Sequence, residues 1–223
     1  MPTQTRSEVR TDDLQLLMES LRQAIKSRRA DTVRRASKSI ELTLEERLAE
    51  TDAAEATPLK RIQIQFLDLS VDWVLRDDSV RLDGHIAEAL LNQAKGIAFD
   101  IGDAEQSMVL SMKWSRLRLL DRDASEADQA EIYATCSQTV GRYEQFHKTI
   151  DTPAYAQAIT AMAVYLYRFG DRRVAKAKLR YAKQFLRSHK ERCLHRRDVG
   201  RMYSMTGHGF RSGLSFLRAL LMP

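Results

Sequence analysis

Hydrophobic residues recur every three or four positions along most of the chain, a spacing typical of helices that bury one face. Few residues interrupt this pattern, because the 223 residues include only nine Gly and four Pro. The fold class predicted is therefore all-α. The periodicity predicts about ten helices, at about residues 12–27, 31–48, 58–73, 80–100, 103–121, 125–149, 153–169, 171–187, 190–206 and 209–222.

The third of these helices is apolar on several sides, so we expect it to lie centrally among its neighbours. Pro58 suits its first turn, where a missing backbone N–H costs nothing. The segment Ile62–Phe66 also alternates like a strand. The apolar run continues to Trp73 without a turn signal, which favours the helix.

Three glycines, each followed by a polar residue, mark predicted helix boundaries: Gly102-Asp103, Gly170-Asp171 and Gly207-His208. Before Gly170 the chain reads ITAMAVYLYRFGD, and it continues with Ala175, Leu179 and Ala182. This segment resembles the tetratricopeptide repeat (TPR), in which a helix ends at Gly-Asp and its partner presents small, large and small residues.

The alignment at Gly207 places Gly200, Tyr203, Phe216 and Ala219 at matching positions. The alignment at Gly102 is weaker, because Ser107 and Trp114 stand where small residues are usual, and residues 125–149 lack a Gly-Asp turn. A plain all-helical domain with chance Gly-Asp turns is the alternative. The length of 223 residues predicts one domain, 1–223. The resemblance covers about the C-terminal 135 residues and implies a TPR-like region of stacked antiparallel hairpins at 80–223, which N-terminal helices at 11–76 precede.

The resemblance also implies a partner-binding groove lined by the first helix of each pair. Its asparagine and arginine side chains would hold a peptide backbone or carboxylate, and Tyr167 would supply apolar contact. The implied groove positions are Asn92, Gln93, Phe99, Gln157, Tyr167, Arg168, Arg197 and Arg201.

Net charge is +6, and the basic residues concentrate in residues 168–201, which hold 13 Lys and Arg against 3 Asp and Glu. A helix at 171–187 would project a basic stripe from one side: Arg173, Lys176, Arg180, Lys183 and Arg187. Like charges at this density repel one another. The stripe is therefore a solvated face, a surface for acidic helices of the same chain at 41–55 or 121–131, or a surface for a polyanionic partner.

Motifs for common catalytic chemistry are missing: the sequence has no P-loop, HExxH or CxxC. His189 and Cys193 share a helix face, while His195 is turned away from them, so a metal site there would lack ligands. The glycines from Gly207 to Gly213 would open a helix, where an anion beside Arg211 is an alternative. We expect no enzyme activity, no catalytic residues, no cofactor and no metal.

Two separated cysteines, Cys136 and Cys193, argue against a secreted disulfide framework, and the first residues lack the apolar core of a signal peptide. We therefore expect a cytoplasmic protein that does not associate with membranes. The function expected is a scaffold or regulatory adaptor that binds a peptide or protein. The alternative is a nucleic-acid-associated or transcription-regulatory protein that uses the basic region. A homodimer through the apolar segment LSFLRALLM is a further expectation.

Overall fold

The computed structural model describes residues 6–52, 55–75, 84–121, 123–147, 152–207, 211 and 214–215. All regular secondary structure in these residues is helical, so the predicted fold class is confirmed, and Ile62–Phe66 lies within a helix. The predicted helix at 209–222 falls largely outside the described residues. The helices in the described ranges are α1 (Arg6–Lys26), α2 (Ala30–Glu50), α3 (Thr57–Val74), α4 (Gly84–Asp100), α5 (Ala104–Leu119), α6 (Glu126–Phe146), α7 (Pro153–Phe169), α8 (Arg172–Lys183) and α9 (His189–Met205).

Contacts divide the chain into two compact units, residues 1–107 and 108–223, with the boundary in the first turn of α5. Each unit has its own buried apolar cluster. The expectation of one cooperative domain stays a prediction, and the two units are described separately.

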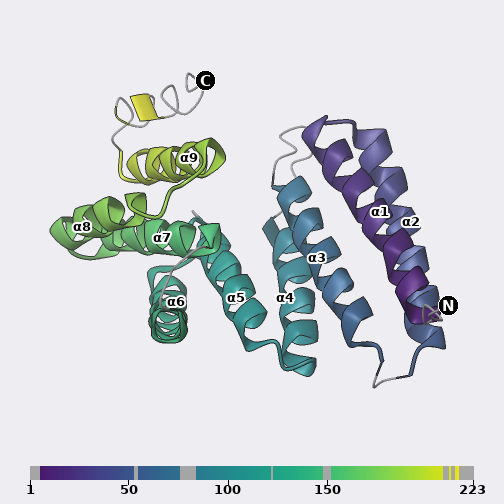
Figure 1. The fold of residues 1–223 in the computed structure, drawn as a ribbon. Coiled ribbons are helices and arrows are strands. Elements are labelled where there is room, and N and C mark those ends of the chain that lie inside the picture. Colours follow the sequence, from purple (N-terminus) through teal and green to yellow (C-terminus); the bar gives the residue numbers. More distant parts are fainter. Residues whose placement is uncertain are drawn as a thin grey trace. The chain divides into compact units, whose positions relative to one another are not determined.

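In the first unit, α3 packs against α1, α2 and α4, as its apolar residues on several sides predict (Figure 1). Its side chains Leu59, Ile62 and Phe66 join residues of α1 and α2 in one cluster. The turn from α1 to α2 is made by Arg28, whose φ is 55°. Arg29 N donates to Ala24 O and Arg28 N to Ile25 O, so Arg28 occupies the left-handed position where glycine is usual.

The first Gly-Asp pair ends α4 and begins α5 as predicted. Gly102 has a φ of 69°, and Asp103 N donates to Ala98 O at 2.9 Å, closing α4 with a left-handed turn. The Asp103 carboxylate then accepts from Gln106 N at 3.1 Å, which caps α5. Asp103 also lies 3.7 Å from the guanidinium of Arg61 on α3.

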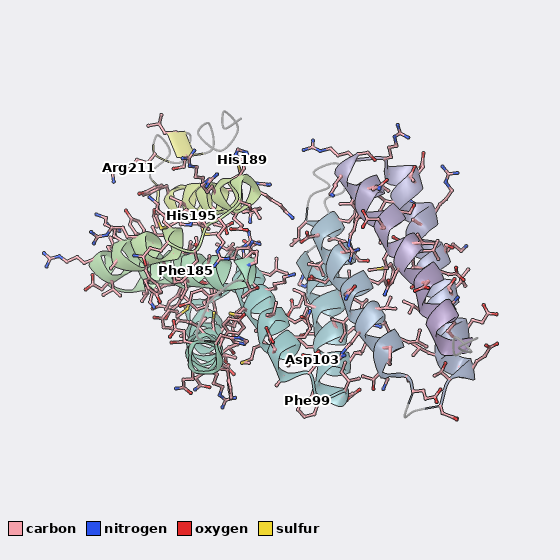
Figure 2. All side chains as sticks on the ribbon, viewed as in Figure 1. Phe99, Asp103, Phe185, His189, His195 and Arg211 are labelled. Atoms are coloured by element: carbon pink, nitrogen blue, oxygen red, sulfur yellow. The ribbon has the colours of Figure 1, made fainter. Side chains whose placement is uncertain are left out.

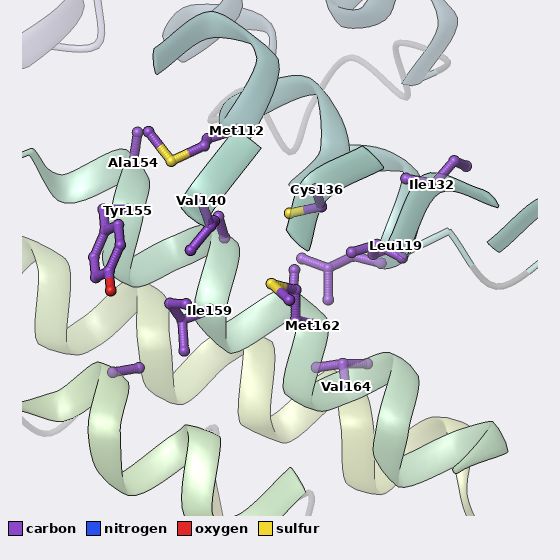
Figure 3. Close-up of a cluster of buried hydrophobic side chains, with 14 of the residues drawn as sticks. Met112, Leu119, Ile132, Cys136, Val140, Ala154, Tyr155, Ile159, Met162 and Val164 are labelled. Carbon is purple, nitrogen blue, oxygen red and sulfur yellow. The ribbon is translucent and has the colours of Figure 1, made fainter. Parts of the chain in front are cut away.

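In the second unit, α7 is the central helix and packs against α6, α8 and α9. Alanines at 154, 156, 158, 161 and 163 are buried along it, and such small residues let neighbouring helices approach closely. Larger side chains of α5, α6 and α7 fill the spaces between the helices (Figure 3). Ala175 and Ala182 of α8 are fully buried and Leu179 is half-buried, which matches the small, large, small pattern at the level of one helix pair.

The prediction of one helix over 171–187 is wrong at its end, because α8 stops at Lys183. Ser188 begins α9 instead: its hydroxyl accepts from Glu191 N, and the Glu191 carboxylate accepts from Ser188 N. This capping box begins α9 after a connection of five residues, 184–188. Arg187 therefore lies in the connection, where its backbone N donates to Glu191 at 2.7 Å, and is not on the helix of the stripe.

Candidate functional site

Four cations of the basic stripe project from α8 into solvent. Arg173, Lys176, Arg180 and Lys183 are all exposed, while Ala175 and Ala182 on the opposite face are fully buried against α7. None of the four forms an ion pair with any described residue.

The acidic residues that follow Asp171 are occupied elsewhere. From Arg172 to Pro223 the sequence contains only Glu191 and Asp198. Glu191 accepts backbone N–H groups in the capping box. Asp198 is 1% exposed and accepts two hydrogen bonds from Arg116 of α5, at 2.9 and 3.0 Å. Among the described residues, neither of these carboxylates pairs with the four cations of α8.

A cavity of about 530 Å³ opens beside the end of α8. The described residues of its wall combine apolar side chains with Lys and Arg and include no Asp or Glu. Figure 2 labels two of its residues, His195 on α9 and Arg211. The described residues of the lining are Leu179, Lys183, Leu186, Arg192, His195, Arg196, Val199, Tyr203, Arg211, Leu214 and Ser215.

His195 is the buried polar group of this cavity, with 5% of its surface exposed. Its Nδ1 lies 2.9 Å from Thr160 Oγ1 on α7. The Thr160 hydroxyl donates its proton to Ala156 O at 2.8 Å, so Nδ1 carries the proton that joins His195 to Thr160. In the neutral ring, Nε2 is then a hydrogen-bond acceptor, and it has no partner.

Burial is the main reason that the pKa of His195 falls from 6.5 to about 4. The carboxylate of Asp198 acts in the opposite direction, and the charges of Lys183 and Arg196 lower the pKa further. At neutral pH the imidazole is therefore uncharged. The wall of the cavity therefore combines a neutral, buried imidazole with exposed or half-buried cations.

Two of the implied groove residues serve internal packing. Tyr167 is 3% exposed, with its ring edge-on to Tyr203, and so it offers no surface to a partner. The Arg168 guanidinium donates to Asp121 O and to Gln129 Oε1, both at 3.1 Å. The fully buried Gln129 donates in turn to Asp121 O at 2.7 Å, so this group fastens the α5–α6 connection to α7.

The other implied groove residues are divided between the two units. Asn92, Gln93 and Phe99 are exposed on α4 of the first unit, and Phe99 is 80% exposed. In the second unit Gln157, Arg197 and Arg201 are half-buried, and Arg201 lies 3.9 Å from Asp198. The cavity beside α8 includes none of them.

Two reactive side chains meet on α9, and a third lies buried on α6. His189 Nε2 and Cys193 Sγ are 3.1 Å apart on α9, as their spacing predicts, but no group of three or more metal-ligating side chains occurs in the described ranges. Burial raises the pKa of the Cys136 thiol to about 11, which makes it a poor nucleophile.

The sequence predicts the exposed cations on α8 but does not predict the cavity. The sequence relates His195 only to the neighbouring Cys193, and Leu186 lies beyond the end of α8, where helical periodicity no longer gives its direction. The sequence feature that bears on the cavity is Thr160, a polar residue within the apolar run of α7. It could not indicate its partner, which is 35 residues away in sequence.

Comparison with known proteins gives no assignment for this chain. No family model matches it, and searches of curated proteins and of solved structures find no significant similarity. Among the described helices, none combines the length and apolar character needed to cross a bilayer.

Proposed function

We propose that this chain is a non-enzymatic helical binding module, a scaffold or regulatory adaptor, that takes an acidic segment of a protein partner on α8 and the adjoining cavity. The observation that carries the proposal is the exposure of Arg173, Lys176, Arg180 and Lys183, none of which forms an ion pair with a described residue. Carboxylates of a partner would reduce the repulsion among them. The apolar wall of the cavity would accept the partner's hydrophobic side chains.

Isothermal titration calorimetry with a short glutamate-rich peptide tests this function. Unlabelled peptide is preferable, because common anionic dyes could themselves occupy the cavity. Changing Arg173, Lys176, Arg180 and Lys183 together to Gln should weaken binding by about tenfold or more, since several exposed ion pairs would be lost. Binding should also weaken as salt is raised.

A matched control removes the same charge elsewhere. Lys26, Arg34, Arg35 and Lys38 are exposed on α1 and α2, and their change to Gln alters the net charge by the same amount. This variant should bind the acidic peptide like the wild type. Equal losses in both variants would mean that net charge, and not the surface of α8, governs binding.

Nucleic acid remains the second candidate, because the same unpaired cations would also contact phosphates. Fluorescence anisotropy with duplex and single-stranded oligonucleotides distinguishes the two. Steeply salt-dependent binding to oligonucleotides, lost in the α8 variant, together with no binding to the acidic peptide, would replace the first proposal with the second.

The TPR-like arrangement is part of the same proposal. In this reading α7 and α8 form one helical pair and α9 begins the next. Support comes from the buried Ala175 and Ala182, from the packing of α9 on α7, and from the buried Gly200 of α9. Homodimerisation through residues 214–222 stays a prediction, which sedimentation velocity at several concentrations would check.

A further inference from the structure

The described lining of the cavity beside α8 separates apolar from charged side chains by their depth. Three of its cations, Lys183, Arg192 and Arg211, are exposed. Leu214 is 38% exposed, whereas the other apolar side chains of the lining are half-buried: Leu179, Leu186, Val199 and Tyr203. Most of the apolar surface of the cavity therefore lies deeper than these positive charges.

The three exposed cations have no carboxylate partner among the described residues. Lys183 and Arg211 form no ion pair there. The guanidinium of Arg192 donates to the backbone carbonyl of Arg187 at 3.4 Å, which leaves its charge without a carboxylate. An anionic group beside the cavity would reduce the repulsion among these cations.

The inner wall contributes no charge. The imidazole of His195 is neutral at neutral pH, and its Nε2 is shielded from the cavity as well as from water. The volume of about 530 Å³ lies within the range of roughly 300–1,000 Å³ that is typical of small-molecule sites. The cavity thus has room for an apolar ligand body and has positive charge at its exposed residues.

We propose that this cavity binds a small anionic amphiphile, a medium-chain alkyl carboxylate, whose chain lies against the half-buried apolar side chains and whose head group pairs with Lys183, Arg192 and Arg211. The inference goes beyond the proposed function, because the ligand is a small molecule and its site does not include Arg173, Lys176 or Arg180. A short carboxylate would leave the apolar wall in contact with water. An uncharged chain would leave the cations without a partner.

Isothermal titration calorimetry with sodium octanoate, sodium butanoate and octanol tests the inference, at concentrations below those at which octanoate forms micelles. Octanoate should bind about tenfold or more tightly than butanoate, because each buried methylene group raises affinity roughly threefold. Octanol has the same chain length without the charge, and it should bind about three- to tenfold more weakly than octanoate.

A double variant, Arg192→Gln with Arg211→Gln, tests the head group. It should weaken octanoate binding by about three- to tenfold and leave octanol binding unchanged. The matched control is Arg34→Gln with Arg35→Gln, which removes the same charge from exposed positions on α2. This control should bind octanoate like the wild type, and an equal loss in both variants would mean that net charge governs binding.

A second variant tests the apolar wall. Leu186 lines the cavity, lies outside the described helices and is not part of the unit's buried cluster, so Leu186→Trp should fill the space and leave the core intact. It should weaken octanoate and octanol alike, by about tenfold or more. Circular dichroism checks that its helix content is that of the wild type, and the arginine variant decides the question if it is not.

The outcomes separate this inference from the proposed function. Equal affinities for octanoate and butanoate, or octanoate binding that the arginine variant and a folded Leu186→Trp leave unchanged, would overturn the ligand site. If octanoate binds as expected and the glutamate-rich peptide does not bind, the ligand site stands and the proposed protein partner fails. Peptide binding without octanoate binding would give the reverse result.

Discussion

At the scale of single residues, Arg28 occupies a backbone conformation that suits glycine. Its φ of 55° places it in the left-handed region, and it closes α1 at an exposed position. A side chain in this region costs about 1 kcal/mol relative to glycine. Arg28→Gly should therefore raise the free energy of unfolding by about 1 kcal/mol, measured by urea denaturation.

Arg28→Ala is the control for this change, because it removes the charge and the long side chain but keeps a β-carbon. It should not stabilise the protein. If both substitutions raised stability equally, relief of charge repulsion near Arg29 would be the cause and the backbone conformation would not.

The buried imidazole of His195 predicts a dependence of stability on pH. Its pKa is about 4 in the folded protein, against 6.5 when unfolded, so the unfolded chain binds more protons between these values. This contribution to stability is present above pH 6.5 and is lost as pH falls toward 4, by roughly 2–3 kcal/mol. Denaturation at a series of pH values should show the decline.

His195→Asn supplies the reference, since asparagine does not titrate. The difference in unfolding free energy between wild type and variant should shrink as pH falls through the window from 6.5 to about 4. Parallel profiles for the two proteins would show that other groups, such as surface carboxylates, account for any loss in acid.

At the scale of helices, the capping box of Ser188 and Glu191 determines where α8 stops and α9 begins. Ser188→Ala removes the acceptor for Glu191 N and should cost about 1 kcal/mol in urea denaturation. Ser39→Ala, at an exposed site within α2, should change stability by only a few tenths of a kcal/mol. A similar cost for both changes would argue that the box contributes nothing.

How well the helix ends could be predicted depends on the local signals that mark them. The limits of α7 are those expected, because Pro153 and Gly170 act within one turn of each end. The predicted end of α8 is wrong, although the sequence SHKE at 188–191 matches the capping-box pattern. The hydrophobic periodicity continues through Phe185 and Leu186, and it therefore predicts a helix that extends past Lys183.

The candidate site also has one part that the sequence predicts and one part that it does not. Periodicity alone placed the four cations together on the outer face of α8, because residues on one helix keep fixed relative directions. The pairing of His195 with Thr160 depends on how α9 packs on α7, and the pairing of Arg116 with Asp198 joins residues 82 apart. Such contacts leave no regular spacing in a single sequence, so the cavity could not be anticipated.

At the scale of the whole molecule, the division into two units predicts how the chain unfolds. Asp198→Ala leaves Arg116 with an uncompensated buried charge in the second unit, which should cost about 3–5 kcal/mol. If the units unfold independently, thermal unfolding followed by circular dichroism should separate into two steps, with only one of them lowered. Glu19→Ala breaks the exposed pair with Arg22 in the first unit and should change stability by at most about 1 kcal/mol. If Asp198→Ala instead lowers the midpoint temperature of a single transition, the chain unfolds as one cooperative domain. The first unit would then lose stability through a contact that lies only in the second unit.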